Sequence, residues 1–200
     1  DPDATLMKSR DGKMACYNVQ TGIDAKHHMI AMAEVTTDEC DINLLKPDLE
    51  NLTEQLGFTP DEIEADKGYG NATQIREIQE TSGTTCYIPM PEPPTKKQDR
   101  ENGIEFTYNA DNDTFTCPNN KILQIHSRDY KQEDQTYNVF KCHDCKGCPI
   151  KGKCTKSKTG RAIKVNVNHR WIDNYREWIG KMENMEKVQH RKTVVEHPFG

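Results

Sequence analysis

The chain has 200 residues, 34% of them hydrophobic, and a formal net charge of −5 at pH 7. That length suffices for one domain with a core, or for one domain with a small insert. No run approaches the roughly 18 apolar residues of a membrane-spanning helix, and the N-terminal sequence lacks the layout of an export signal. We therefore expect no membrane association and a cytoplasmic protein. The missing initial methionine and the end just after a proline predict a fragment of a longer protein.

The charges are distributed very unevenly along the chain. Residues 34–66 contain eleven carboxylates and only Lys46, whereas residues 141–176 contain ten Lys or Arg against two Asp, a local balance of +8. Such a concentrated basic stretch predicts contacts with nucleic-acid phosphates, for which the candidates are Lys151, Lys153 and Lys156. The alternative is a solvated lysine-rich loop.

The first elements in chain order predict a hairpin. The segments ACYNVQTGID (15–24) and HHMIAMAEVTT (27–37) alternate in polarity and are joined by a short turn. They predict two antiparallel strands, the first with one face formed by Tyr17, Val19, Thr21 and Ile23.

A helix and a βαβ unit are predicted next. Asp41 is the expected N-cap of a helix that ends at Gly57 and has leucines at helical spacing, namely Leu45, Leu49, Leu52 and Leu56. The segment DEIEADKGYG predicts a short strand that ends in a glycine-flanked turn. A capped helix from Asn71 to Gly83 and a strand in TTCYIPMP follow. Strand, helix and strand in this order predict a parallel pairing.

The amino-acid composition of the chain changes after the second of these strands. Residues 91–103 are rich in proline and charge, which is typical of a linker. Short strands with polar turns are predicted beyond it, and from about Asn168 the pattern becomes helical.

Five of the eight cysteines are candidate metal ligands. Cys142, Cys145, Cys148 and Cys154 have the spacing C-x2-C-x2-C-x5-C, and Cys117 lies upstream in FTCPNNK. Zinc takes four tetrahedral soft ligands, and C-x2-C steps reach one metal ion without strain. We favour a structural zinc bound by Cys117, Cys145, Cys148 and Cys154, with Cys142 as the alternative ligand.

Other readings of the cysteines stay open. His143 is a weaker ligand candidate, and an iron–sulfur cluster or redox thiols are the alternatives to zinc. In a cytosolic chain, clustered cysteines favour such chemistry over disulfides. Nearby lysines are expected to lower the pKa values of the thiols. The isolated Cys16, Cys40 and Cys86 are expected to be ordinary buried residues.

Two carboxylates are candidates for catalysis. Asp66 is expected at the C-terminal end of a parallel strand, where open α/β sheets place their ligands; the alternative role is that of a turn former. Glu196 follows two valines, Val194 and Val195, near the end of a helix. A strand carboxylate and a helix carboxylate can hold Mg²⁺, and two such ions organise in-line phosphoryl transfer.

Seven segments resemble, in the same order, bacterial insertion-sequence transposases of the DDE type, most of all the insertion-sequence eleven-eighty-two group. They are DPDATLMK, YNVQTGID, VTTDECDINLL, ADKGYG, CPNNK, CKGCPIKGKCT and RKTVVEHPFG. The resemblance implies an RNase H-like mixed sheet with flanking helices. In that fold two Asp and one Glu bind two Mg²⁺ ions, while water and then a DNA 3′-hydroxyl attack phosphodiester bonds. It makes Asp66 the second acid and Glu196 the third.

The resemblance also implies a layout and partners. Residues 1–90 form the first part of the catalytic core, 91–168 an insert with the zinc knuckle, and 169–200 the helical part that carries the Glu. DNA ends and target DNA are the expected partners, with a homodimer in the full-length protein and a place beside the bacterial nucleoid.

The chain departs from the family pattern in three respects, one of which is that the lysine usually following PFG would lie beyond Gly200. The family's first aspartate lies upstream of DPDA, so we expect an N-terminally truncated core that is inactive by itself. The Tyr and Arg that often precede the Glu are replaced by Gln189 and Lys192. The alternative function is a zinc-binding nucleic-acid-binding protein, or a domesticated, non-catalytic derivative of a transposase.

Overall fold

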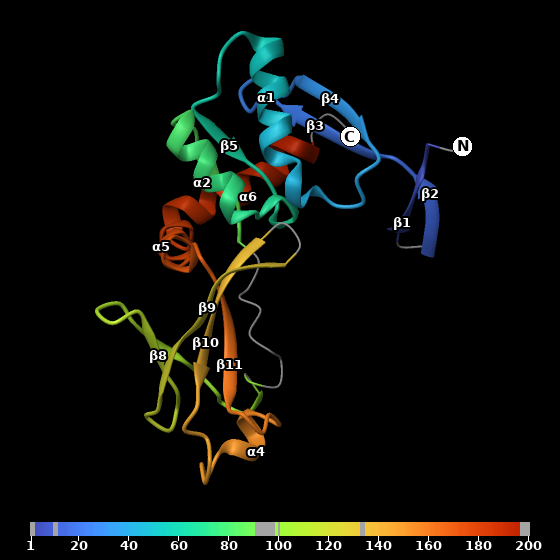
Figure 1. The fold of residues 1–200 in the computed structure, drawn as a ribbon. Coiled ribbons are helices and arrows are strands. Elements are labelled where there is room, and N and C mark those ends of the chain that lie inside the picture. The colour runs from blue at the N-terminus through green and yellow to red at the C-terminus, as the bar shows by residue number, and fades with distance from the viewer. Residues whose placement is uncertain (1–2, 10–11, 91–98, 100, 133–134, 197–200) are drawn as a thin grey trace. The chain divides into compact units, whose positions relative to one another are not determined.

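The protein is described by a computed structural model that covers residues 3–9, 12–90, 99, 101–132 and 135–196, without the side chain of Glu196. Helices and strands of both pairing types make it a mixed α/β protein (Figure 1). Its contacts divide the chain into two compact units, Asp1–Pro91 with Arg170–Gly200, and Glu92–His169. Most of the predicted linker, 91–103, lies outside the described residues. No helix in the described part is long and apolar enough to cross a membrane.

Two antiparallel hairpins begin the first unit. Strands β1 (Thr5–Ser9) and β2 (Gly12–Cys16) form one, and β3 (Asn18–Ile23) and β4 (Ile30–Thr36) form the other. The second hairpin confirms the prediction. Its alternation exposes Val19 (59% exposed) and buries the polar Gln20 (3%). The inward face of β3 is therefore polar, which matters for the site described below.

A short 3-10 turn, η1 (Asp41–Asn43), precedes helix α1 (Leu45–Leu56), which ends at Gly57 as predicted. Gly57 has a φ of 74° and donates its N–H to the Thr53 carbonyl, a C-cap that favours glycine. The prediction that Asp41 is the helix N-cap is wrong. Asp41 lies inside η1, and its side chain accepts hydrogen bonds from the β3 side chains Asn18 and Gln20 instead.

The predicted βαβ unit is confirmed. Strands β5 (Glu62–Glu64) and β6 (Thr85–Tyr87) pair in parallel, and η2 (Lys67–Tyr69) and helix α2 (Ala72–Thr81) connect them. Asn71 caps α2 by accepting hydrogen bonds from the N–H groups of Thr73 and Gln74.

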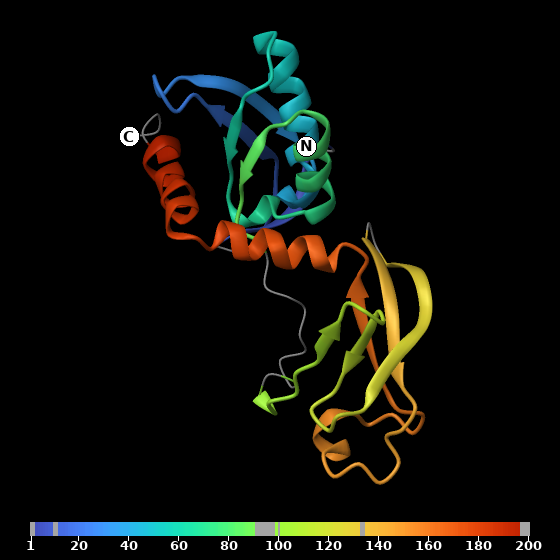
Figure 2. The same ribbon diagram turned by 90° about the vertical axis from the view of Figure 1, so that its left-hand side faces the viewer.

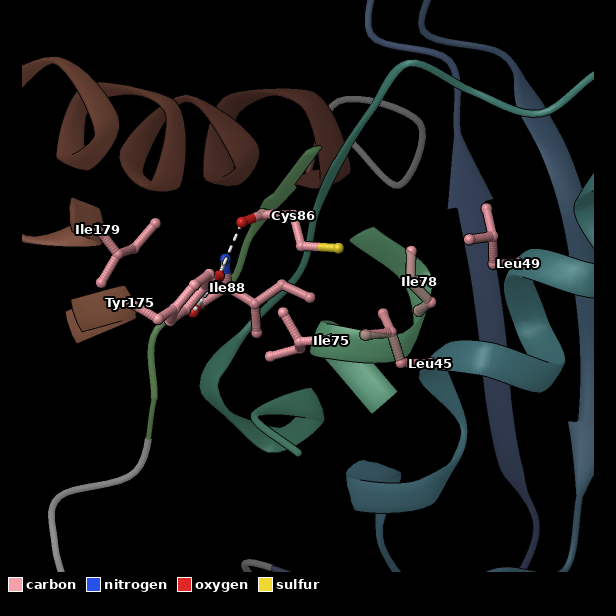
Figure 3. Close-up of a cluster of buried hydrophobic side chains, with 8 residues drawn as sticks. All are labelled: Leu45, Leu49, Ile75, Ile78, Cys86, Ile88, Tyr175 and Ile179. Carbon is pink, nitrogen blue, oxygen red and sulfur yellow. Dashed lines mark hydrogen bonds between the residues drawn. The ribbon is translucent and has the colours of Figure 1, made fainter. Parts of the chain in front are cut away.

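The core of the first unit joins this βαβ unit to a helix from the far end of the chain. Helix α5 (His169–Ile179) contributes Tyr175 and Ile179, which pack in one cluster with Ile75, Ile78, Cys86 and Ile88 (Figure 3). The Tyr175 hydroxyl donates to the Cys86 carbonyl (2.7 Å) and accepts from the Ile88 N–H (3.2 Å). Helix α6 (Met182–Glu196) follows α5 at an angle (Figure 2). Both helices confirm the helical pattern predicted from about Asn168.

The second unit is a five-stranded antiparallel sheet in the order β11-β10-β9-β8-β7. Its strands are β7 (Thr107–Asn109), β8 (Thr114–Thr116), β9 (Ile122–Gln132), β10 (Gln135–Cys142) and β11 (Arg161–Asn166). A small core of Phe115, Leu123, Phe140 and Cys142 lies on the sheet. The short helix α4 (Lys151–Cys154) lies in the connection from β10 to β11.

The isolated cysteines differ in burial. Cys86 is fully buried, as predicted, whereas Cys40 is exposed and Cys16 is half-buried. The prediction is wrong for these two because Cys40 precedes η1 in a loop and Cys16 ends a hairpin that is exposed along β2.

Candidate functional site

Asp66 follows β5 and begins the turn η2. Its Oδ1 accepts a hydrogen bond of 2.6 Å from the Gly68 N–H, so Asp66 serves as a turn former. The same position places its carboxylate just beyond the C-terminal end of a parallel strand, the edge where α/β sheets bind ligands. The two predicted roles of Asp66 are therefore compatible.

A second carboxylate, Asp41, faces the same place. A Cβ atom built on Gly68 would lie 2.8 Å from Oδ1 of Asp66 and 3.2 Å from Oδ2 of Asp41. The other oxygen of Asp41 accepts from Asn18 Nδ2 (2.7 Å) and Gln20 Nε2 (2.9 Å). The absence of a side chain at Gly68 leaves room between two carboxylates that come from separate elements.

Sequence reasoning missed Asp41 as part of this site. The signal that was available is the polar, inward face of β3, because Asn18 and Gln20 alternate with exposed residues on a strand. A buried side-chain amide needs hydrogen-bond partners, and Asp41 is that partner for both.

A hydrogen-bonded chain fixes the orientation of Asp41. The Tyr69 hydroxyl donates to Gln20 Oε1, and Gln20 Nε2 donates in turn to Asp41. Burial raises the pKa of Tyr69, and the charges of Asp41, Asp48 and Asp66 raise it further. The phenol therefore keeps its proton at neutral pH and remains a donor.

The potential in this region is negative. Burial raises the pKa of Asp48 to about 6, and the neighbouring Asp41 and Glu34 add to that shift. A cation that binds among these carboxylates would relieve their repulsion.

Helix α6 lies along β5, and two of its side chains contact glutamates of that strand. Lys187 Nζ lies 2.5 Å from Glu62 Oε2, and His190 Nδ1 lies 3.5 Å from Glu64 Oε2. Glu62 and Glu64 share a face of the strand that leads to Asp66, and the next helical residue, Arg191, lowers the pKa of Tyr69. The last turns of α6 therefore lie near the Asp66 end of β5.

The helix end that carries Glu196 is anchored by its valines. Val194 is buried and Val195 is half-buried. The Glu196 side chain lies outside the described residues, so its separation from Asp66 stays a prediction.

The five clustered cysteines surround one small cavity in the second unit. Cys117, Cys142, Cys145, Cys148 and Cys154 line a space of about 20 Å³, together with Lys121, Asp144 and Arg161. No group of three or more His, Cys, Asp or Glu side chains in the described part of the chain is arranged so as to hold a metal ion. The sulfurs are thus gathered around one space without forming a coordination geometry.

Two tight turns contribute three of the cysteines that line this cavity, Cys117 in the first and Cys145 and Cys148 in the second. In the first, Asn120 (φ 54°) donates its N–H to the Cys117 carbonyl; in the second, which contains Gly147 (φ 74°), Cys148 donates to the Cys145 carbonyl. The Asn119 side-chain amide lies 3.5 Å from the Cys148 sulfur and links the two turns. Among these contacts, the Asn119 amide is the donor that reaches a sulfur, whereas the N–H groups of Asn120 and Cys148 donate to carbonyls.

The expectation that lysines lower the thiol pKa values is wrong for two of these cysteines. Burial raises the pKa of Cys142 to about 11, and a hydrogen bond with Cys145 contributes. Burial also raises the pKa of Cys154, against the opposing effect of Arg161. Desolvation of a thiolate outweighs the lysines because Lys153 and Lys156 are exposed to solvent. His143 is likewise exposed.

Fewer cations of the basic segment 141–176 are exposed for contact with nucleic acid than its composition indicates. Lys151 and Lys153 lie on α4, and Lys156 follows it. Arg161, counted in the local charge of +8, is only 7% exposed and pairs with Asp99. One of the ten cations is therefore directed inward.

The fold and these two groups of residues define a mixed α/β protein with an acidic strand end and a cysteine cluster. Residues 116–200 match the family model described as "Transposase DDE domain". The matched region contains all five clustered cysteines and Glu196 but not Asp66, and it supports a DDE transposase, an enzyme class that cleaves DNA and transfers strands. Neither the search of curated proteins nor that of solved structures found a match.

Proposed function

We propose that this chain belongs to the catalytic region of a DDE transposase of the insertion-sequence eleven-eighty-two group, with an RNase H-like core. The observation that carries the proposal is the position of α6 along β5, which directs the helix bearing Glu196 toward the strand end bearing Asp66. The family match over residues 116–200 supports it independently. In this layout residues 1–90 and 169–200 form the core, and 91–168 are an insert.

The residues around Asp66 fit the divalent metal that DDE transposases generally use. Two carboxylates face the space over Gly68, and hard oxygen ligands suit Mg²⁺. When bound, Mg²⁺ stabilises the charge that develops on a phosphodiester and its attacking oxygen. In the proposal Asp66 and Glu196 hold the ions, Asp41 faces the same space, and the Tyr69–Gln20 chain keeps Asp41 oriented.

Metal binding and cleavage by two variants test this function. Asp66→Asn and Glu196→Gln should weaken Mn²⁺ binding measured by electron paramagnetic resonance, while circular dichroism stays unchanged. In a protein extended upstream to restore the first aspartate, both substitutions should also abolish Mg²⁺-dependent nicking of plasmid DNA. Glu54→Gln, at an exposed acid of α1, is the control and should bind Mn²⁺ normally. Native Mn²⁺ affinity in both active-site variants would rule out the metal role.

For the second unit we propose a structural zinc bound by Cys117, Cys145, Cys148 and Cys154, with Cys142 as the alternative ligand. The shared cavity and the two linked turns support it, because thiolates are the preferred ligands of structural zinc. Binding of zinc would supply the free energy that keeps these buried thiols deprotonated. Cys148→Ser should lose the metal and destabilise the insert, whereas Cys40→Ser, at an exposed cysteine, should not.

A non-catalytic, zinc-dependent nucleic-acid-binding protein is the second candidate function. The family match favours it in one respect, since the matched residues include the cysteine cluster but not Asp66. DNA is the substrate or partner in both cases. DNA binding that is unaffected by Asp66→Asn, combined with absence of cleavage under all divalent ions even when the upstream segment with the first aspartate is restored, would favour this alternative.

A further inference from the structure

A buried arginine, Arg161, lies at the wall of the cysteine cavity. It begins β11, its side chain is 8% exposed, and its ion-pair partner Asp99 is 5% exposed. A guanidinium out of water is costly unless its charge and its donors are matched. We therefore ask which groups match the charge and the N–H donors of Arg161.

Its donors are only partly used. One terminal nitrogen donates to the Asp99 carboxylate, and the other donates to the backbone carbonyl of Cys154 at 2.6 Å. The guanidinium carbon lies 5.2 Å from the centre of the Phe106 ring. The N–H on Nε is buried and has no hydrogen-bond partner among the residues that the structure describes.

A buried N–H without an acceptor, beside a group of cysteines, indicates that a thiolate sulfur is its acceptor. The cavity wall that includes Arg161 carries five cysteines, and its one carboxylate, Asp144, is exposed and paired with Lys121. Four thiolates around one Zn²⁺ carry a net charge of about −2, and such centres are stabilised by donors and cations just outside the ligands. Arg161 supplies both.

We propose that Arg161 is a positioning residue of the zinc site, an inference that rests on the zinc proposed above. Asp99 fixes the guanidinium, the bond to its carbonyl holds Cys154 in place, and the free N–H and positive charge face the metal-bound thiolates. The Asp99–Arg161 pair is then an orienting device for the site and not only a stabilising ion pair.

Zinc competition against a chelator tests the proposal, with the visible absorption of the Co²⁺-loaded protein as a second readout of thiolate ligation. Arg161→Met should weaken zinc binding by about 10- to 100-fold, as loss of an outer partner of a metal ligand typically does. Asp99→Asn keeps the guanidinium and should weaken binding much less. The matched control is Arg128→Met, at an exposed arginine of β9 that pairs with Asp113, and it should bind zinc normally.

The outcomes separate the two proposals. Absence of zinc or Co²⁺ binding in the native protein would remove the zinc proposal itself. Native zinc affinity in Arg161→Met, with an unchanged spectrum of the Co²⁺-loaded protein, would leave the zinc and overturn the role of Arg161. If Arg161→Met does not fold, Arg161→Lys is used instead. It keeps the positive charge but lacks the planar set of N–H donors of the guanidinium. A several-fold loss of affinity is expected, and an unchanged affinity would contradict the proposal.

Discussion

The absence of a side chain at Gly68 allows the carboxylates of Asp41 and Asp66 to approach the same place. The Asp66 oxygen lies at a distance from an ideal Gly68 Cβ that real Cβ atoms do not adopt. Glycine is required here for space and not for a left-handed backbone, since its φ lies outside that region. Glycine at a close approach is thus a marker of the site as well as of the turn.

Gly68→Ala should therefore impair metal binding with little loss of helix or sheet. The new methyl group must displace Asp66 or Asp41, so Mn²⁺ affinity should fall at least several-fold. Gly152→Ala, where a Cβ meets no atom within 4 Å, is the control. Unchanged Mn²⁺ affinity in Gly68→Ala would place the metal elsewhere.

Asp48 should make the first unit less stable as the pH rises. Its folded-state pKa is raised to about 6, mainly by burial, whereas the ordinary value is 3.8. The folded state therefore binds the proton more tightly, and the stability that this contributes is present below about pH 4 and lost as the pH rises through about 6. Urea unfolding at pH 5 and pH 7 should show this decrease in the native chain and a smaller one in Asp48→Asn. An equal decrease in both would exclude Asp48 as the cause.

At the scale of elements, the contact between α5 and β6 joins parts of the first unit that lie far apart in the sequence. The Tyr175 hydroxyl satisfies backbone groups of Cys86 and Ile88, which lie at the end of a short strand (Figure 3). Buried backbone groups cost free energy when they lose their partners. The side chain therefore does more than fill space in the core.

Tyr175→Phe should lower the free energy of unfolding by about 1–3 kcal/mol, because it keeps the ring but leaves a buried acceptor and donor unpaired. Urea unfolding monitored by far-ultraviolet circular dichroism measures the change. Tyr87→Phe, whose hydroxyl makes only a long 3.5 Å bond to Glu62, is the control and should cost about 0.5 kcal/mol or less. Similar decreases in the free energy of unfolding in both variants would show that the Tyr175 hydrogen bonds stabilise the fold no more than the Tyr87 bond does.

At the scale of the whole molecule, the acidic segment 34–66 belongs to the first unit and most of the basic segment 141–176 belongs to the second. The carboxylates of residues 34–66 include Asp41, Asp48 and Asp66 of the acidic site. The lysines of the second unit include Lys153 and Lys156, which are exposed. A negative net charge is therefore compatible with DNA binding, since phosphate contacts depend on local charge.

Charge reversal of Lys151, Lys153 and Lys156 should weaken binding to all DNA sequences alike. Each lost phosphate contact should reduce the slope of log affinity against log salt by about 1. Fluorescence anisotropy between low and moderate salt measures this, with Lys26→Glu, at an exposed lysine of the β3–β4 turn, as the control. An unchanged salt slope in the triple variant would favour the solvated loop.

Much of the local structure was predictable because short-range chemistry decides it. Asn71 caps α2, Gly57 ends α1, and the βαβ unit has the expected parallel pairing. Caps, turns and polarity patterns depend on neighbours within a few residues, so they can be predicted from the sequence alone. The gathering of the five cysteines around one cavity likewise follows from their spacing and from one upstream strand end.

Partnerships between distant residues were not predictable in the same way. Asp41 has the features of a helix cap, and only the packing of η1 against β3 makes it the acceptor for Asn18 and Gln20. Arg161 has the features of one more surface cation in a basic segment, yet it is buried against Asp99, 62 residues away. The thiol pKa values also depend on burial, which no spacing of lysines reveals.

The sequence by itself determined most elements, the caps Asn71 and Gly57, and the candidate ligands Asp66, Cys117, Cys145, Cys148 and Cys154, because residue type and spacing encode them. Only the tertiary structure decided that Asp41 and Asp66 both approach Gly68 and that Arg161 lines the cavity of the cysteines. The reason is physical: a buried charge or amide is stable only with a partner. Which residue becomes that partner depends on elements that meet after the chain folds.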